Sequence, residues 1–440
     1  MQAVILAGGK GKRLGRLAQG LPKPMVQVGG KPVLEHQIKL LAQAGIKDIW
    51  ILTGYKAEKI SEYFGDGRKW GVKLHYSKEI EPLGTAGAVK SIAAKLNSDF
   101  LVMYGDVMVN FDVKRFINFH RRLGKKAIAS IVVHPNDHPL ESDLVEVKNN
   151  QVVNFFPKPH PEGIWYRNLV SAAVYILSPK IFSFIPSDRQ TDFGKNIFPL
   201  AFKKKKNILA YLTGEYFRDM GKPRQLREVR GDYESGRYQH LTYQNKQQAI
   251  FLDRDGVINQ EVDQLAKVSD LRVYDFAAGA IKKINQSKYL TIVVTNQPMV
   301  AKGFLTLTEL NEIHKKLETE LGILGAKIDA IYFCPHHPQR GFKGEVKALK
   351  INCQCRKPKI GLIKQAAADF NLDLTRSYLI GDSRRFDYQT AVNAGLKFVG
   401  VKTGYGCQDT ANYGRIKPRH LLIRKNLQKA VDYIIKNKGK

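Results

Sequence analysis

Short runs of β-branched and other apolar residues alternate with longer amphipathic stretches along the whole chain. This alternation predicts strands followed by helices, and hence α/β domains with largely parallel sheets. In such sheets ligands bind beyond the carboxyl ends of the strands. The expected strands are Ile49–Thr53, Phe100–Tyr104 and Ala127–Val133 in the first half, and Leu290–Thr295, Asp329–Phe333, Tyr378–Ile380 and Phe398–Val401 in the second.

Two further apolar strands, Ala3–Leu6 and Ala249–Leu252, each run into a loop of glycines or acidic residues. Between these two openings, roughly from Gly231 to Gln248, the chain is polar and aromatic with little periodicity. The length of 440 residues fits two domains of ordinary size. We therefore expect domains at 1–232 and 249–440, joined by a linker at 233–248.

Composition narrows the function classes. Hydrophobic residues make up 43% and charged residues 25%, which excludes wholesale disorder. Lys and Arg number 71 against 40 Asp and Glu, so the net charge of +31 indicates an anionic partner, an anionic substrate or a compositional bias. No segment approaches the ~20 apolar residues of a membrane span, and the start has no signal-peptide pattern. We expect a cytoplasmic protein without a membrane partner.

The first loop, 7–14, reads Ala-Gly-Gly-Lys-Gly-Lys-Arg-Leu. Its glycines let the backbone approach a phosphate chain closely, and Arg13 can clamp phosphate oxygens. The loop is not a Walker A motif, and alone it is equally well explained as a tight turn into a helix. Other features in the first half suit phosphate and Mg²⁺: Lys23 between two prolines, the small-residue loop from Leu83 to Ala88, and the separated carboxylates Asp106 and Asp219.

In this order the features resemble the sugar-1-phosphate nucleotidyltransferases, over about residues 1–230. The resemblance implies a Rossmann-like sheet and attack of a sugar phosphate on a nucleoside triphosphate, with release of pyrophosphate. It also implies that Arg13 and Lys23 stabilise the triphosphate, that Asp106 and Asp219 hold Mg²⁺, and that Lys158 grips the sugar phosphate. The implied nucleotide-binding set is Ala7, Gly8, Gly9, Gly11, Arg13, Lys23, Glu79, Gly84, Thr85 and Asp106.

Three departures from the family pattern concern the sugar contacts. Pro157 stands where the family usually has Glu, residues 171–173 read Ser-Ala-Ala instead of Asn-Ala-Gly, and residues 219–223 read Asp-Met-Gly-Lys-Pro. For the base, Glu79 and Glu81 lie next to the Leu83 loop. A carboxylate accepts well from the N1–H and N2–H₂ groups of guanine, which favours GTP. The alternative is that both glutamates face solvent.

In the second half, Asp253 and Asp255 follow the strand Ala249–Leu252. Two carboxylates one residue apart at a strand end suit a nucleophile and a general acid/base sharing Mg²⁺, although a turn or part of a calcium loop would also fit. Later loops offer further candidates. Thr295 and Asn296 suit a phosphoryl oxygen, Arg356 and Lys357 can neutralise the attacking carboxylate and the phosphate, and Asp382 suits Mg²⁺.

This order resembles the haloacid-dehalogenase superfamily over about residues 249–435. The resemblance implies a Rossmannoid sheet, attack by Asp253 to form an aspartyl-phosphate, and proton transfer by Asp255. The implied Mg²⁺ ligands are Asp253, Asp255 and Asp382; for the second aspartate the family usually uses the backbone carbonyl. Asp387 would support the metal shell or a lysine.

The cysteines Cys334, Cys353 and Cys355 crowd together with a His-His pair at 336–337. Cys-x-His followed by Cys-x-Cys is a good four-ligand set for structural zinc. Chemistry alone does not choose between His336 and His337; the family resemblance favours His336. The zinc loop narrows the resemblance to the D,D-heptose 1,7-bisphosphate phosphatases and the related histidinol-phosphate phosphatases. Pro298, where relatives favour Ser-Gly-Ile, departs from their pattern.

Together the halves resemble a heptose bisphosphate phosphatase fused to a heptose 1-phosphate guanylyltransferase, which implies synthesis of GDP-heptose, a donor for bacterial surface glycans. The implied partners are GTP and phosphorylated heptoses, with Mg²⁺ at both sites. Three alternatives stay open: a mannose-1-phosphate guanylyltransferase fused to a histidinol-phosphate-like phosphatase, a nucleic-acid end-processing protein, and a zinc scaffold without activity. A nucleic-acid enzyme would need a Walker A kinase module or a recognisable binding fold, and the sequence has neither. Anomer preference and homo-oligomerisation are left open.

Overall fold

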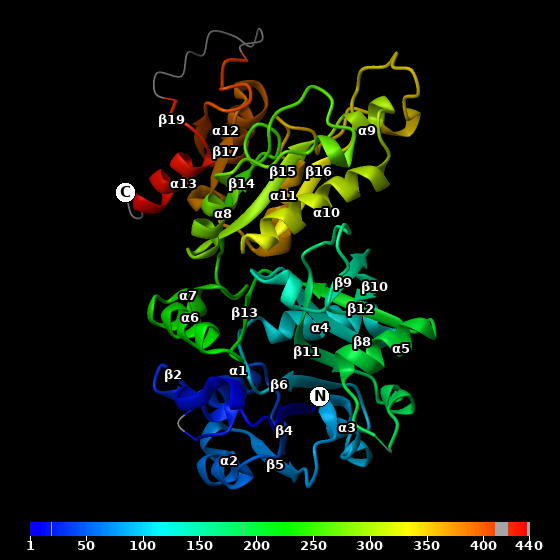
Figure 1. Cartoon of the computed structure of the whole chain (residues 1–440), viewed down its shortest axis with the longest axis vertical. Helices are drawn as coiled ribbons and strands as arrows, with labels where there is room; N and C mark the ends of the chain where they lie inside the picture. The colour runs from blue at the N-terminus through cyan, green and yellow to red at the C-terminus, as the bar shows by residue number, and fades with distance from the viewer. Residues whose placement is uncertain (19, 188, 410–420, 438–440) are drawn as a thin grey trace. The chain divides into compact units, whose positions relative to one another are not determined.

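The computed structural model describes residues 1–18, 20–187, 189–409 and 421–437. They form two compact units, which are drawn in Figure 1. Unit 1 comprises 1–134, 143–158 and 169–244, and unit 2 comprises 135–142, 159–168 and 245–440. Within unit 2, Arg167 Nε lies 2.8 Å from Glu318 Oε2, which ties one of the two short early segments to helix α10 (Leu307–Ile323). Within the described residues, no helix is both long and apolar enough to cross a membrane.

The expected linker at 233–248 is partly helical. Helix α6 runs from Pro223 to Glu234, α7 covers Arg237–His240, and strand β14 begins at Gln248. Tyr238 and Tyr243, which gave this stretch its aperiodic aromatic character, are both buried. The compact units therefore divide after Gln244, with little chain left over to act as a linker.

Unit 1 is built on a nine-stranded sheet in the order β5-β4-β1-β6-β11-β8-β12-β10-β9. The sheet is mixed, because β11 runs antiparallel to both β6 and β8. Its strands are β1 Ala3–Ala7, β4 Asp48–Thr53, β5 Lys73–Lys78, β6 Phe100–Tyr104, β8 Ala127–His134, β9 Leu144–Lys148, β10 Gln151–Phe156, β11 Val170–Leu177 and β12 Asn207–Leu212. Two ribbons accompany the sheet: β2 (Gln27–Val28) with β3 (Lys31–Pro32), and β7 (Val107–Asn110) with β13 (Tyr216–Asp219).

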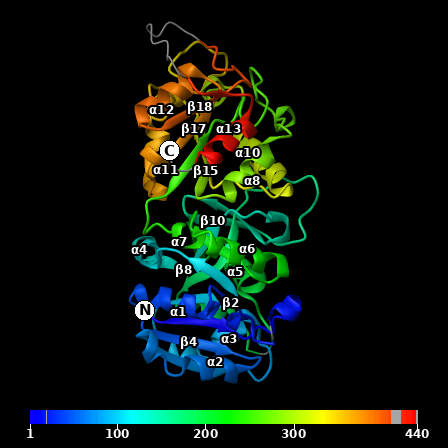
Figure 2. The same ribbon diagram turned by 90° about the vertical axis from the view of Figure 1, so that its left-hand side faces the viewer.

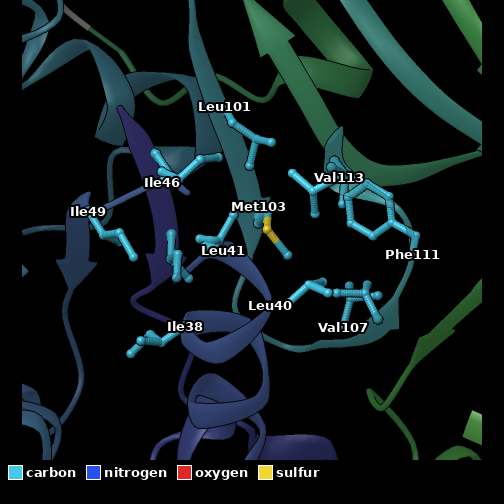
Figure 3. Packing of buried hydrophobic residues seen from close by; sticks show 14 of the residues in the cluster. Ile38, Leu40, Leu41, Ile46, Ile49, Leu101, Met103, Val107, Phe111 and Val113 are labelled. Carbon is cyan, nitrogen blue, oxygen red and sulfur yellow. The ribbon is translucent and has the colours of Figure 1, made fainter. Parts of the chain in front are cut away.

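The helices of unit 1 cover this sheet with their apolar faces. Figure 3 shows Ile38 and Leu41 of α1 beside Ile49, Leu101 and Met103, all of which are buried. Burial on this scale stabilises the layer by about 1.5–3 kcal/mol for each large side chain. Besides α6 and α7, the helices are α1 Val33–Gln43, α2 Ala57–Phe64, α3 Gly84–Lys90, α4 Val113–Leu123 and α5 Phe198–Lys203.

Unit 2 has a fully parallel six-stranded sheet in the order β16-β15-β14-β17-β18-β19. In Figure 2, α11 and α12 lie on one side of its strands, and α8, α10 and α13 lie on the other. The strands are β14 Gln248–Leu252, β15 Tyr289–Asn296, β16 Ala330–Cys334, β17 Tyr378–Gly381, β18 Lys397–Val401 and β19 Ile423–Arg424. Besides α10, the helices are α8 Ala277–Asn285, α9 Met299–Lys302, α11 Gly361–Phe370, α12 Gln389–Ala394 and α13 Leu427–Lys436.

Candidate active sites

The first site gathers around the buried Lys23. Its Nζ forms an ion pair with Asp106 and lies 3.4 Å from Asp219 Oδ1. Asp106 directly precedes β7 and Asp219 ends β13, and the register of this ribbon pairs Asp219 with Val107. The pairing brings together two carboxylates that are 113 residues apart in the sequence. The structure thus unites three of the expected residues.

Arg13 completes what we call the Lys23 cluster: Arg13, Lys23, Asp106 and Asp219. A Cβ atom added to Gly221 would lie 2.9 Å from Asp219 Oδ2 and 3.1 Å from an Arg13 guanidinium nitrogen, so both groups crowd against this glycine. The Lys23 backbone N–H also donates to the Gly9 carbonyl at 3.4 Å, which links the cluster to the glycine loop after β1. Two cations and two carboxylates beside the glycine loop suit a phosphate chain with Mg²⁺, which prefers oxygen ligands.

Glu79 lies against the glycine loop. Its Oε2 would be 3.2 Å from a Cβ atom on Gly8, and its backbone N–H donates to the Thr53 carbonyl at 2.8 Å. Partial burial raises the pKa of the Glu79 carboxyl group. Glu81 is exposed. Of the two glutamates considered for base recognition, Glu79 is therefore the one placed beside the loop.

Two other expected residues have different surroundings. The Thr85 hydroxyl donates to Asp192 Oδ1 at 2.8 Å and accepts the Phe193 N–H at 3.0 Å, so it fastens the start of α3 to the neighbouring chain. Gly84 is required there, because its φ is +74° and a Cβ atom would lie 2.5 Å from the Thr191 carbonyl oxygen. Lys158 is exposed beyond the end of β10, outside the Lys23 cluster.

The second site lies at the carboxyl edge of the parallel sheet in unit 2. Asp253 follows β14 and Asp382 follows β17. Lys357 Nζ lies 2.8 Å from Asp253 Oδ2 and 2.6 Å from Asp387 Oδ1. Carboxylate oxygens of Asp253, Asp382 and Asp387 all lie within 4.8 Å of one another. We call these four residues the Lys357 cluster.

Burial dominates the electrostatics of this cluster. Burial and the neighbouring Asp387 raise the pKa of Asp253 to about 7. Burial, with Asp387 and Asp253 adding to it, raises the pKa of Asp382 to about 9. Burial opposes the charge on Lys357, but the Asp253 and Asp387 carboxylates outweigh it and raise the pKa of the lysine. Three buried carboxylates with one lysine leave excess negative charge, so this oxygen-rich set fits a divalent cation.

Backbone groups of two loops surround the Asp382 carboxylate. It accepts the Tyr405 N–H at 2.7 Å. Cβ atoms on Gly256 and Gly404 would lie 2.2 Å and 1.9 Å from Asp382 Oδ2, and both glycines have positive φ. The glycine after the Asp-Arg-Asp segment thus lets the backbone close around this carboxylate.

The Asp255 side chain lies outside the group formed by the Asp253, Asp382 and Asp387 carboxylates. Both of its oxygens accept hydrogen bonds from Arg254, at 2.8–3.0 Å. Asn259 Nδ2 and Gln297 Nε2 also donate to it, each at 2.8 Å. The side chain is turned towards these donors.

The sequence analysis assigned no role to Arg254, Asn259 or Gln297. Arg254 is completely buried, and it also donates to Gln297 Oε1 at 3.0 Å and contacts His314 Nε2 at 3.3 Å. Burial and the positive charge of Arg254 lower the pKa of His314 well below its usual value, so this imidazole is neutral. One feature of the sequence could have indicated these contacts: an arginine stands between the two aspartates of the motif. If such a side chain is buried, its charge must be paired with a neighbouring group.

Of the remaining expected residues of this site, Asn296 holds the loop that carries Lys357. Asn296 Oδ1 accepts the Lys357 N–H at 2.9 Å, and Asn296 Nδ2 donates to the Lys357 carbonyl at 3.2 Å. The buried Thr295 hydroxyl accepts from Gln297 at 2.8 Å. Arg356 NH1 donates to the His336 carbonyl at 3.4 Å, so it lies beside the cysteine loop.

The cysteine cluster consists of Cys334, His336, Cys353 and Cys355, whose ligand atoms lie within 4.8 Å of one another. The three sulfur atoms are 3.2–3.5 Å apart, and His336 Nδ1 lies 3.2 Å from Cys355 Sγ. Four ligands around zinc at about 2.3 Å imply sulfur separations of about 3.7 Å, so the set is close to a tetrahedral site. His337 is outside it, with its Nδ1 3.5 Å from the Gln339 carbonyl.

Comparison with known proteins finds a different family in each half of the chain. A family model described as nucleotidyl transferase matches residues 2–236, and a HAD-hydrolase-like model matches residues 354–430. The mannose-1-phosphate guanylyltransferase catalytic subunit beta of Drosophila melanogaster is 32% identical over 276 residues, which cover 61% of this chain and 71% of that protein.

Two solved structures are similar to the separate halves. HddC from Yersinia pseudotuberculosis, complexed with GMP-PN, is 29% identical with a TM-score of 0.45, covering 53% of this chain and 99% of that one. The D,D-heptose 1,7-bisphosphate phosphatase from B. bronchiseptica, complexed with magnesium and phosphate, is 31% identical with a TM-score of 0.38, covering 43% of this chain and 98% of that one.

Proposed function

The chain belongs to the nucleotidyl transferase family and also carries a HAD-like hydrolase domain, and from this premise we propose that it catalyses two steps of GDP-heptose synthesis. The hydrolase domain removes the 7-phosphate of D-glycero-D-manno-heptose 1,7-bisphosphate. The transferase domain then moves GMP from GTP to heptose 1-phosphate and releases pyrophosphate. The observation that carries the proposal is the cysteine cluster placed immediately before Arg356 and Lys357. This combination is typical of the heptose bisphosphate phosphatases and the related histidinol-phosphate phosphatases, and a heptose substrate is the one that a guanylyltransferase domain on the same chain can use next.

In the hydrolase site, Asp253 is the nucleophile. Its carboxylate oxygen attacks phosphorus, the bond to the sugar oxygen breaks, and Asp255 gives that oxygen a proton; Asp255 then takes a proton from the water that hydrolyses the aspartyl-phosphate. Lys357, 2.8 Å from Asp253, neutralises the charge that gathers on the phosphoryl group. Mg²⁺ held by Asp253, Asp382 and the Asp255 carbonyl would supply further charge neutralisation.

In the transferase site, catalysis is positioning and charge stabilisation. Arg13 and Lys23 bind the triphosphate that the glycine loop cradles, and the oxygen of the sugar phosphate displaces pyrophosphate from the α-phosphorus. Mg²⁺ held by Asp106 and Asp219 would neutralise the triphosphate. Glu79, which lies beside Gly8, accepts the N1–H and N2–H₂ groups of guanine.

Zinc in the cysteine cluster has a structural role in this proposal. Four protein ligands leave no open position for substrate or water. The cluster joins the end of β16 to the segment that precedes Lys357. Its metal would therefore order the loop that carries Arg356 and Lys357.

A second candidate is mannose 1-phosphate as the sugar substrate. It is favoured by the curated relatives, which include mannose-1-phosphate guanylyltransferases 31–34% identical to this chain. The two candidates share GTP and differ in the sugar phosphate and in what the hydrolase domain acts on.

A product assay with the full chain separates them. The α and β heptose 1,7-bisphosphates and mannose 1-phosphate are each supplied with GTP, UTP or dTTP, and phosphate, pyrophosphate and nucleotide sugars are measured. We expect GDP-heptose from the bisphosphate and GTP. GDP-mannose formed faster from mannose 1-phosphate would replace the proposal with the second candidate.

The guanine argument has its own matched pair of variants. Glu79→Gln should reduce the preference for GTP over UTP, since an amide presents a donor to one guanine N–H. Glu81→Gln changes the exposed neighbour and should leave the preference as it is. Equal turnover of the unmodified protein with UTP would refute guanine recognition.

A further inference from the structure

Unit 1 contains a cavity of about 780 Å³ that none of the expected site residues line. The basic side chains in its wall include one arginine and four lysines: Arg121, Lys125, Lys126, Lys180 and Lys206. We call it the basic cavity. Its volume is within the ~300–1,000 Å³ range of small-molecule sites.

The basic cavity lies at the opposite edge of the nine-stranded sheet from the Lys23 cluster. Ser98 and Asp99 come directly before β6, and Ala127 begins β8. Ser178 follows β11, which runs antiparallel to both strands and therefore ends at the same edge. Asp106, by contrast, follows the carboxyl end of β6. The five residues of β6 alone separate the two places by ~16 Å, at ~3.3 Å per residue.

The charge in the cavity is strongly unbalanced. All five cations are exposed, and within the part of the chain that the structure describes none of them forms an ion pair. Asp99 is the one carboxylate in the wall, and its Oδ2 already contacts His120 Nε2 at 3.0 Å. His120 is itself buried, with Nδ1 2.8 Å from Ser130 Oγ. The like charges repel one another, and an anion that enters the cavity relieves this repulsion.

The hydroxyl groups in the wall add donors to these charges. Ser98, Ser178 and Ser183 line the same space, and arginine, lysine and hydroxyl groups together form the usual donor set for phosphate oxygens. Half-buried Phe184 and buried Ile128 are the apolar side of the wall. The residues that line the basic cavity include no row of exposed aromatic rings, so it suits a compact anion better than a nucleic-acid strand.

We propose that the basic cavity is a non-catalytic binding site for a small molecule that carries two or more phosphate groups. Five cations exceed the charge of a single phosphate, whereas a diphosphate or triphosphate matches several of them at once. The proposal does not depend on which sugar or base the transferase uses.

Site-resolved lysine labelling of the full chain tests it. The protein is acylated with and without inorganic pyrophosphate at matched ionic strength, and mass spectrometry measures the labelling of each lysine. Pyrophosphate should protect Lys125, Lys126, Lys180 and Lys206 several-fold. The neighbouring Lys203 and Lys204 are exposed and outside the cavity, so their labelling should stay constant. Because each lysine is followed separately, pyrophosphate bound at either catalytic site does not obscure the result.

A matched pair on helix α4 supplies the variant test. Arg121→Ala should raise the pyrophosphate concentration that gives half protection by about tenfold, the equivalent of ~1.4 kcal/mol for a charge-assisted hydrogen bond. Arg122→Ala removes an exposed arginine outside the cavity and should change nothing. The proposal would be overturned if pyrophosphate protected none of these lysines or protected all exposed lysines equally. Stronger protection by a single-stranded oligonucleotide than by pyrophosphate would also overturn it.

Discussion

Arg254 shows how one residue of a short motif can hold its neighbours in place. It is completely buried and pairs with Asp255, Gln297 and His314. Arg254→Ala leaves the Asp255 carboxylate without its cation, and removing one partner of a buried pair costs about 3–5 kcal/mol. We expect calorimetry to show a much lower melting temperature for the hydrolase domain. Exposed Arg340→Ala is the control, with a change within about 0.5 kcal/mol; equal melting temperatures would contradict the role of Arg254.

Glu215 makes the stability of the transferase domain depend on pH. Burial raises the pKa of its carboxyl group to about 7, although the N–H groups of Asp112 and Tyr243 donate to Oε1 and the Thr213 hydroxyl donates to Oε2. The folded state therefore holds the proton more tightly than the unfolded chain. The resulting stabilisation is complete below about pH 4.5 and is lost as the pH rises through about 7, a change on the order of 3 kcal/mol.

Glu215→Gln isolates this effect. The amide oxygen can keep both backbone hydrogen bonds, and the amide nitrogen can donate to Thr213 in place of the bond that Oε2 accepts. Denaturant unfolding of both proteins at about pH 5 and about pH 8 should show a flatter pH dependence in the variant. The same pH dependence in both proteins would mean that Glu215 does not titrate in this range.

The bulge in strand β11 is a strained element. The register against β8 shifts between Ser171 and Tyr175, and Ala173 has a φ of +57°. This is the position at which the related family carries glycine, and a left-handed residue with a side chain costs about 1–2 kcal/mol. Ala173→Gly should stabilise the transferase domain by about 0.5–1 kcal/mol after the entropic cost of glycine. Ala172→Gly, next to it and without positive φ, should destabilise it by a similar amount; thermal unfolding compares the two.

The cysteine cluster is the element that metal removal should affect. A zinc-selective chelator, with Mg²⁺ kept in excess, should remove about one zinc per chain, since four ligands are present. The loop of residues 335–359 should then be cleaved faster by a protease, and phosphatase activity should fall while nucleotidyl transfer persists. Cys353→Ser should bind less zinc, whereas Cys407→Ser, a buried cysteine outside the cluster, should bind the full amount. Equal zinc content in both variants would exclude the cluster as the site.

At the level of elements, the sequence predicted what depends on local pattern. Apolar runs such as Phe100–Tyr104 became strands with the same bounds, and the Cys-x-His and Cys-x-Cys spacings brought their ligands together. Features that depend on long-range pairing were missed. Nothing local indicates that β11 runs antiparallel inside the sheet or that 135–142 and 159–168 belong to unit 2. Buried tyrosines likewise made the expected linker look aperiodic, because their partners are distant in sequence.

For the whole molecule, the net charge of +31 is only partly explained by the sites. Arg13, Lys23, Arg356 and Lys357 serve the two candidate active sites, and the basic cavity adds five more cations. Lys23 and Lys357 are paired with carboxylates at the same place, whereas the five cations of the cavity form no ion pair within the described residues. A local excess of positive charge, such as the one in the basic cavity, indicates a bound phosphate compound more directly than the net charge of the whole chain does.

Two catalytic sites on one chain predict that each activity can be removed alone. Asp253→Asn removes the proposed nucleophile of the hydrolase domain and should abolish phosphate release, with pyrophosphate release from GTP and the proposed heptose 1-phosphate unchanged. Lys23→Gln removes the ammonium group between Asp106 and Asp219. It should abolish pyrophosphate release and leave phosphate release unchanged. The two reactions, assayed separately with their own substrates, measure this directly. If either variant lost both activities while calorimetry showed both domains folded, the sites would depend on each other, and independent catalysis by the two domains would be ruled out.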